Sequence, residues 1–304
     1  MTGRVLRCCT FVATSALLAA SLGTTPLAKG GIRKSLFVSA LDQAGKPVTG
    51  LTAQDVLIRE DNVDRQVVEV KPASQPISVA VLVDTAQGKR VTDAYGTAEE
   101  YVRDLRVSVN AFTAELMANS KDASVLLGEF GQAAMTVTPF TQSPQEIDKG
   151  VKRLVSRPDV GSVLFEALVR ANGDLAKQPT ARRAIVSLNL EPSDEQSRED
   201  PNKVRNSFAA SGAQLWAVSV QRGGLKNSKR DLVLNDLAKY TGGQRDFVVG
   251  ISAVENIMRG YAAALASQFE VVYERPENAK GVKLVLVGTA RPDVKLHASV
   301  FAPQ

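Results

Sequence analysis

The chain from about residue 35 to residue 72 alternates apolar and polar positions with period two. This alternation is typical of strands that bury one face. Between the runs lie Gly-Lys-Pro at residues 45–47 and Asp-Asn at residues 61–62. These residue types reverse the chain, because glycine and asparagine tolerate a left-handed backbone and proline fixes its own torsion angle. The pattern predicts a small antiparallel β unit.

The middle of the chain, from about residue 77 to residue 269, has a different rhythm, in which continuous apolar runs alternate with segments of helical spacing. The runs are residues 77–83, 125–127, 184–186 and 215–220. Strands that are apolar on both faces are typical of a parallel sheet with helices on each side. This part of the chain therefore predicts a buried sheet.

The segments between these runs repeat their apolar residues at spacings of three and four, which places them along one face of a helix. One such stripe consists of Val102, Leu105, Val109, Phe112 and Leu116. The runs at residues 125–130 and 135–140 are close enough in sequence to form one hairpin. The order predicts an α/β fold, with a doubly wound, mostly parallel sheet flanked by helices and a small β unit formed by the N- and C-terminal extensions.

The first residues have the layout of a secretory signal peptide. Arg4 and Arg7 precede an apolar stretch at residues 8–22, and Pro-Leu-Ala follows at residues 26–28. The apolar stretch is short for a membrane span. We therefore expect cleavage near Ala28, export to the periplasm or the outside of the cell, and no stable membrane span afterwards.

These zones predict four parts of the chain. They are a signal peptide at residues 1–28, a β-rich leader at 29–74, an α/β domain at 75–269 and a C-terminal β segment at 270–304. The leader and the C-terminal segment are each too small to be stable alone, so we expect their strands to pair with each other.

Composition narrows the classes of function. Both cysteines, Cys8 and Cys9, lie in the predicted signal peptide, so the mature chain has no disulfide, cysteine nucleophile or thiolate metal site. The net charge of +5 falls to +3 once Arg4 and Arg7 are removed with the predicted signal peptide, and the remaining basic and acidic residues are interspersed. Nucleic-acid binders have a clustered basic face, so no nucleic-acid partner is expected. With His297 as the single histidine and no Gly-x-Ser-x-Gly turn, a serine hydrolase lacks its parts.

Several segments resemble one family. Residues 79–84, Val-Ala-Val-Leu-Val-Asp, resemble the first strand of von Willebrand factor A (VWA) domains, which ends in the aspartate of an Asp-x-Ser-x-Ser loop. Residues 48–61 resemble the β leader of bacterial secreted members. Later landmarks of that group match residues 183–186, 237–243 and 267–273. The resemblance covers nearly all of the mature chain and implies a Rossmann-like VWA fold.

The resemblance also implies a metal site, the metal-ion-dependent adhesion site (MIDAS). In the family, an aspartate and two serines of the first loop, a threonine of a second loop and an aspartate of a third surround a magnesium or manganese ion, and a partner carboxylate completes the shell. Here Asp84 is retained, Ala86 and Gly88 replace the two serines, Ser162 replaces the threonine and Leu190 replaces the second aspartate. We therefore expect a degenerate MIDAS with no metal and no other cofactor. If an ion bound, its ligands would be Asp84 and Ser162.

The leading hypothesis is an exported, non-enzymatic, adhesion-like module that binds a protein partner at the carboxyl ends of the sheet strands, without metal. The residues assigned to this rim are Asp84, Thr85, Gln87, Ser162 and Glu191. The first alternative is metal-dependent adhesion, with magnesium or manganese held by a site that Glu191 repairs through a one-residue shift. A second is a structural subunit of an envelope assembly.

The third alternative is a carboxylate-based hydrolase, in which Asp159, Glu191 and Asp194 approach Asp84.

Simple structural roles compete with each of these functional roles. Asp84 is expected to cap its loop by accepting backbone N–H bonds, and Ser162 stands where a helix N-cap belongs. Trp216 is expected in the core, His297 on a surface or edge strand, and residues 191–200 in a solvated loop.

Overall fold

A computed structural model describes residues 31–87, 98–158, 160–191, 194–221, 227–279 and 281–303. The predicted signal peptide, residues 1–28, lies outside the described residues. The described residues belong to one compact unit, Gly31–Gln304. No helix within these ranges is long and apolar enough to cross a membrane.

The centre of this unit is a six-stranded sheet with the order β12-β11-β10-β5-β7-β8. Its strands are β5 (Ile77–Val83), β7 (Ser124–Phe130), β8 (Ala134–Thr141), β10 (Arg182–Glu191), β11 (Gln214–Gln221) and β12 (Gln244–Val248). All neighbouring strands are parallel except β7 and β8, which form the predicted hairpin. The doubly wound, mostly parallel sheet is confirmed.

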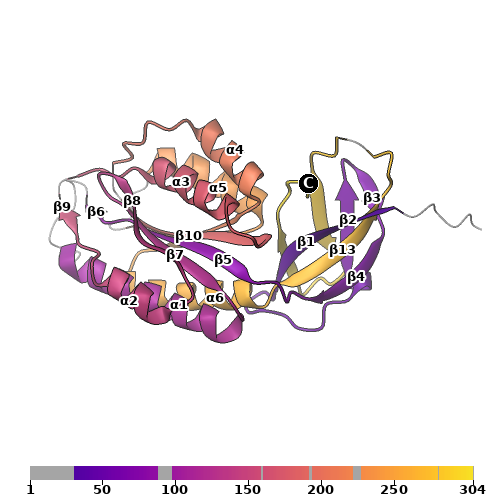
Figure 1. Ribbon diagram of the computed structural model, residues 1–304, viewed down its shortest axis with the longest axis horizontal. Helices are drawn as coiled ribbons and strands as arrows, with labels where there is room; N and C mark the ends of the chain where they lie inside the picture. The colour runs from indigo at the N-terminus through magenta and orange to yellow at the C-terminus, as the bar shows by residue number, and fades with distance from the viewer. Residues whose placement is uncertain are drawn as a thin grey trace, which may run out of the picture. The chain divides into compact units, whose positions relative to one another are not determined.

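Helices cover both faces of this sheet (Figure 1). One face carries α1 (Ala98–Asn119), α2 (Pro144–Val151) and α6 (Val254–Ala266), and the other carries α3 (Leu164–Ala176), α4 (Pro201–Ser211) and α5 (Ser228–Thr241). Successive side chains of a strand point to opposite faces. Val79 and Val81 of β5 therefore pack in the first core, whereas Ala80 and Leu82 pack in the second.

The terminal extensions build two antiparallel sheets, as predicted. One has the order β15-β1-β13-β4 and the other the order β14-β2-β3. Their strands are β1 (Ile32–Leu41), β2 (Val56–Glu60), β3 (Val63–Arg65), β4 (Val67–Pro72), β13 (Phe269–Arg275), β14 (Val285–Thr289) and β15 (Lys295–Ala298). Each sheet combines strands from both ends of the chain, so the two extensions form one β unit with a shared core.

Four further short elements lie in the described part of the chain. They are the 3-10 helices Ala53–Asp55 and Ile251–Ala253, and a two-stranded pair of β6 (Ala86–Gln87) with β9 (Arg157–Pro158).

Two single residues lie where the sequence predicts them. Trp216 is buried in β11, with its ring centroid 5.1 Å from that of Tyr261. His297 lies on β15, the edge strand of the four-stranded sheet, and its Nδ1 is 3.0 Å from the carbonyl oxygen of Gly243.

Candidate functional site

The assigned rim residues lie at the carboxyl ends of the strands of the central sheet. Asp84 and Thr85 directly follow β5, Glu191 ends β10, and Ser162 precedes α3. All four are fully buried. Gln87 lies in β6, and its side chain is outside the described part of the structure. We call the surrounding loops, residues 84–87, 131–133, 160–163, 194–200 and 227–230, the strand-end edge.

Asp84 is held by three donors. Its Oδ1 accepts the backbone N–H of Ala86 at 3.1 Å, and its Oδ2 accepts the backbone N–H of Leu190 at 3.2 Å. These bonds confirm the predicted capping role. The third donor is Arg230, whose Nη1 lies 2.8 Å from Asp84 Oδ2.

Arg230 comes from the first turn of α5 and joins two carboxylates. Its Nε donates to Glu195 Oε2 at 2.8 Å, while its Nη1 donates to Asp84 and to the carbonyl of Leu190. The side chains of Arg230 and Asp84 are fully buried, and that of Glu195 is 1% exposed. We call Asp84, Arg230 and Glu195 the ion triad. Buried charges require such pairing, because an unpaired charge in the interior is strongly destabilising.

Burial and pairing act in opposite directions on these groups. Burial raises the pKa of Asp84 to about 6, although Arg230 and the two backbone donors favour the ionised form. Burial also acts to lower the pKa of Arg230, but Asp84 and Glu195 outweigh it and raise that pKa above its ordinary value. At neutral pH Asp84 is therefore ionised beside a guanidinium that stays charged.

Glu191 belongs to a second buried cluster. Its Oε1 lies 3.1 Å from Nη2 of Arg245, whose Nη1 lies 2.7 Å from Oδ1 of Asp231. Its Oε2 accepts the backbone N–H of Asn227 at 3.2 Å. The carboxylate of Glu191 is thus bound by Arg245 and by the turn that opens α5. It shares no partner with Asp84 in these contacts.

The loop before α3 is joined to the loop after β10 by backbone bonds. Ser162 donates its backbone N–H to the backbone carbonyl of Asp194 at 2.9 Å, and its own carbonyl accepts the backbone N–H of Gln196 at 2.8 Å. The prediction that Ser162 is an N-cap is wrong, because α3 begins after Val163 and the N–H of Phe165 is accepted by Ser197 Oγ. Ser162 Oγ has no partner among the described residues.

The prediction of a solvated loop at residues 191–200 is also wrong in part. Glu191 and Ser197 are buried, and the side chain of Glu195 is 1% exposed. Only some positions of this segment, including Gln196 and Arg198, are exposed.

A divalent cation does not fit this arrangement. Oδ2 of Asp84 is committed to Arg230, Ala86 offers no side-chain oxygen, and Leu190 packs in the core. Within the described ranges, no group of three or more His, Cys, Asp or Glu residues is placed to hold a metal ion. Magnesium requires a nearly octahedral shell of oxygen ligands, and a fixed guanidinium repels it. Arg230 is therefore paired with the one aspartate of the implied site that this chain retains, Asp84.

The exposed part of the strand-end edge contains a groove. It is a cavity of about 670 Å³ between the turn that joins β7 to β8, the start of α3 and the loop after β10. Its lining includes Gln132, Val163, Gln196 and Arg198. Three of these, Gln132, Gln196 and Arg198, are exposed.

The topology decides the fold. Five parallel strands with an antiparallel edge strand, helices on both faces, and an aspartate directly after the central strand β5 form the arrangement implied by residues 79–84. The chain has a VWA fold.

Comparison with solved structures finds similar folds. The conserved hypothetical protein BatB from Bacteroides thetaiotaomicron is 15% identical, with 62% of this chain and 98% of that chain covered at a TM-score of 0.47. The VWA domain of SpRpn10 is 13% identical, with 59% of this chain and 94% of that chain covered at a TM-score of 0.45. A von Willebrand factor type A protein from Catenulispora acidiphila is 13% identical, with 90% of this chain and 75% of that chain covered at a TM-score of 0.46.

These identities and TM-scores are low, so the assignment of the VWA fold rests on the strand order and on Asp84. No protein-family model matches the chain. No curated protein matches it either.

Sequence reasoning missed the arginines of this site. Arg230 lies 146 residues after Asp84 and 35 residues after Glu195. Its neighbours, Ser-Lys-Arg-Asp at residues 228–231, have the composition of an ordinary solvated helix start. No local signal distinguishes a buried arginine there from an exposed one.

Proposed function

We propose that this protein is an exported, non-enzymatic interaction module that binds a partner protein at the strand-end edge without metal. The observation that carries this proposal is the ion triad, in which Arg230 supplies a fixed positive charge to Asp84 at 2.8 Å. A site that contains its own cation needs no bound ion to hold the loops in place.

The fold supports this location. In open α/β sheets, ligands bind outside the carboxyl ends of the strands, where the loops gather. The groove of about 670 Å³ lies at this edge. We assign the direct contacts to the exposed residues Gln132, Gln196 and Arg198. Asp84, Thr85, Ser162 and Glu191 act from beneath by fixing the loops that carry those contacts.

The absence of catalysis is part of the proposal, and the state of the carboxylates supports it. An acid/base pair needs carboxyl groups that are free to exchange protons with a substrate. Asp84 and Glu195 are both paired with Arg230, and Glu191 is paired with Arg245. Asp159 lies outside the described residues. Substrate turnover that disappears in Asp84→Ala and Glu191→Ala would contradict this part of the proposal.

Export is proposed from the sequence of residues 1–28. Its test is the amino-terminal sequence of the protein recovered from the periplasm or the medium. A mature chain that begins shortly after Ala28 supports export. A full-length chain retained in the cytoplasm contradicts it.

The test of binding uses crosslinking in the native cell envelope, followed by identification of the captured partner. Arg198→Glu reverses a charge at the groove, and Gln196→Trp adds bulk beside it. The matched control is Lys121→Glu, which makes the same charge change at an exposed position before β7, at the opposite end of the strand.

We expect recovery of the partner to fall at least tenfold for both groove variants and to stay unchanged for the control. Equal recovery for all the variants would mean that the partner does not bind at the strand-end edge. Capture that depends on contacts elsewhere would favour the alternative of a structural envelope subunit.

A further inference from the structure

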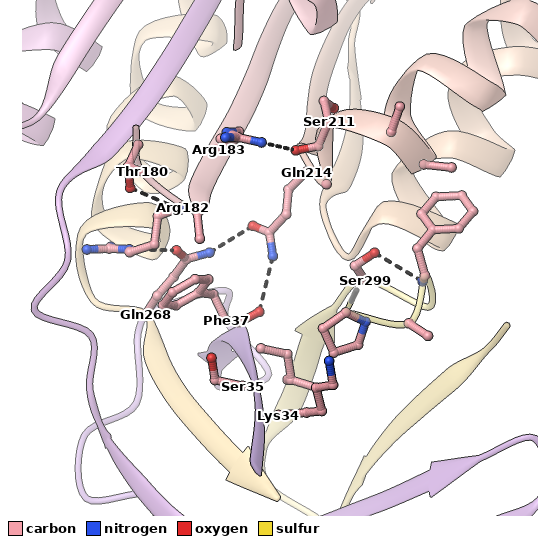
Figure 2. A pocket seen from close by; sticks show the side chains of 18 of the residues that line it. Lys34, Ser35, Phe37, Thr180, Arg182, Arg183, Ser211, Gln214, Gln268 and Ser299 are labelled. Atoms are coloured by element: carbon pink, nitrogen blue, oxygen red, sulfur yellow. Dashed lines mark hydrogen bonds between the residues drawn. The ribbon is translucent and has the colours of Figure 1, made fainter. Parts of the chain in front are cut away.

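A second cavity lies at the other end of the central sheet. It has a volume of about 560 Å³ and is enclosed by β1, by the amino ends of β10 and β11, and by the last residues of the chain. Figure 2 shows Phe37 of β1, Gln214 of β11 and Gln268 of the turn before β13 converging on it. Gln268 Nε2 donates to Gln214 Oε1 at 2.8 Å, and Gln214 Nε2 donates to the carbonyl of Phe37 at 3.5 Å.

One wall of this cavity is an unpaired strand edge. β1 pairs with β13 from Ile32 to Val38, but it pairs with β15 only from Val38 to Leu41. Beyond Ala298 the chain turns away from β1. Val300 donates its backbone N–H to the carbonyl of Tyr240 at 2.8 Å, and Ala302 donates its backbone N–H to the carbonyl of Lys283. Residues 33–37 therefore have no neighbouring strand on this side among the described residues.

The backbone groups of this edge point into the open side at every second residue. The carbonyl of Phe37 accepts a bond from Gln214 across the cavity, so the backbone groups of Phe37 face the open side. The carbonyl of Ala40 accepts the N–H of Val48, and neighbouring residues of a strand direct their backbone groups to opposite sides. The N–H and C=O groups of Arg33 and Ser35 thus face the same way as those of Phe37.

The side chains around the cavity are basic. Arg33, Lys34, Arg182 and Arg183 line it, and none of the described lining residues is Asp or Glu. Arg182 donates to the carbonyls of Gln75 and Leu265 at 2.6 and 2.7 Å. Arg183 donates to the carbonyls of Ser211 and Gln178 at 2.8 Å each.

Carbonyl oxygens accept bonds from both arginines, but these neutral partners do not neutralise the charge of either guanidinium. Burial lowers the pKa of Arg182 to about 10, so this side chain remains charged at neutral pH. The cavity therefore combines the backbone donors and acceptors of a strand edge that pairs with no other described strand with positive charge. Its apolar surface includes Phe37 and Phe301.

We propose that residues 33–37 of β1 bind an extended acidic peptide segment of a partner protein, which adds to the sheet as a further strand. Strand addition at an open edge is a common mode of peptide recognition, in which backbone bonds give affinity and flanking side chains give specificity. The edge is about 16 Å long at about 3.3 Å per residue. Its basic lining selects a segment that carries aspartate or glutamate.

The test begins with a selection of random 12-residue peptides on the purified protein. Selected peptides are synthesised with a fluorescent label, and their affinities are measured by fluorescence anisotropy. Ser35→Pro removes the backbone N–H that faces the open side, at an exposed position of the strand. Ser35→Ala is its matched control, because alanine keeps that N–H.

A second pair of variants tests the charge without altering the backbone. Arg33→Glu combined with Lys34→Glu reverses two charges at the cavity. Lys121→Glu combined with Lys239→Glu makes the same change in net charge at two exposed positions elsewhere. This pair keeps the test decisive even if the proline variant fails to fold.

We expect the selection to enrich acidic peptides whose affinity falls at least tenfold in Ser35→Pro and in the charge-reversed cavity variant. The two control proteins should bind within twofold of the unchanged protein. A selection without such peptides would overturn the proposal, as would equal binding by the cavity variants. Peptides that lose affinity only in Arg198→Glu would also overturn it, while supporting the function proposed for the strand-end edge.

Discussion

Arg230 Nη1 lies 2.8 Å from Asp84 Oδ2, and both side chains are fully buried. The same guanidinium contacts Glu195 through its Nε at 2.8 Å. It therefore connects the loop after β5, the loop after β10 and the first turn of α5. A divalent cation connects such loops through several oxygen ligands, whereas an arginine does so with hydrogen bonds of fixed direction. Arg230 thus joins these loops through contacts made within the chain itself.

The first prediction concerns metal binding. Magnesium or manganese chloride at millimolar concentration should leave the melting temperature of the protein unchanged, because Oδ2 of Asp84 is already paired with Arg230. An ion present at a hundred times its dissociation constant would add about 2.7 kcal/mol of stability, which corresponds to a rise of about 5 °C for a domain of this size. A rise of that order with either ion, confirmed by calorimetric titration, would show that a metal site exists.

The second prediction concerns the ion triad. Arg230→Met should lower the free energy of unfolding by about 3–5 kcal/mol, because it leaves the buried carboxylates of Asp84 and Glu195 unpaired. Combining it with Asp84→Asn removes one of those charges. The double variant should therefore lose less stability than the sum of the two single variants, by about 1 kcal/mol or more. Denaturant unfolding of the four proteins measures this difference.

The exposed residue Arg198 provides the control for that cycle. Arg198→Met should change stability by less than about 0.5 kcal/mol, as is usual for surface positions. Additive losses for Arg230→Met and Asp84→Asn would mean that the contact between these two side chains contributes nothing to stability.

The fold could be predicted from the sequence because each strand can be recognised from its own pattern of apolar residues. The run at residues 77–83 is apolar at nearly every position, and all of β5 is buried. The alternating pattern of the extensions likewise identified the β unit. Asp84 was predicted as a loop cap because an aspartate at the end of a buried strand has backbone donors within reach.

The chemistry of the strand-end edge could not be predicted in the same way. The polar, turn-rich composition of residues 191–200 predicts a solvated loop around Glu195. Its partner, Arg230, comes from a different helix and is brought close only by the folding of the sheet. A charged residue is buried when its counter-ion is buried with it. That condition depends on tertiary contacts that a single sequence does not reveal.

The third prediction concerns the β unit. Glu60 is fully buried, and its Oε1 accepts the hydroxyl of Tyr273 at 2.5 Å and Nη2 of Arg275 at 2.6 Å. Desolvation acts to raise the pKa of Glu60, but bonds from Arg275, Tyr273 and Arg65 hold it below its usual value. Glu60→Gln should lower the free energy of unfolding by about 3–5 kcal/mol, because it leaves Arg275 without its carboxylate.

Tyr273→Phe is the milder variant at the same contact. It removes one hydrogen bond to a charged group and should cost about 1.5–3 kcal/mol. Urea unfolding of both variants measures these losses. A Glu60→Gln variant as stable as the unchanged protein would mean that the pairing with Arg275 is not maintained in solution.

The fourth prediction concerns the pH dependence of Asp84. Its pKa in the folded protein is about 6, above the ordinary value of 3.8, because the side chain is buried. Between these two values the folded state binds more protons than the unfolded state, so this group stabilises the protein as the pH falls from 7 towards 4. Asp84→Asn removes the effect. The difference in stability between the unchanged protein and this variant should therefore move in favour of the unchanged protein as the pH falls. A constant difference would show that the pKa of Asp84 is not raised.

The fifth prediction concerns His297, the only histidine of the chain. Its contribution to stability depends on pH in the same range as that of Asp84. Burial lowers its pKa below 6.5, although the carbonyl of Gly243 favours the protonated ring. The unfolded state therefore binds more protons near pH 6, and the stability that this residue contributes is present above pH 6.5 and is lost as the pH falls. This direction is opposite to that of Asp84.

His297→Phe separates the two effects, because phenylalanine does not titrate and can still stack on Trp216, whose ring centroid is 5.9 Å from that of the imidazole. Thermal unfolding at pH 7 and pH 5 should show a smaller loss, or a larger gain, of stability on acidification for His297→Phe than for the unchanged protein. Since the chain has one histidine, its imidazole resonances in an NMR titration report the same pKa directly. A midpoint at or above 6.5 would show that the pKa of His297 is not lowered in the folded protein, and would remove the reason for the difference in unfolding.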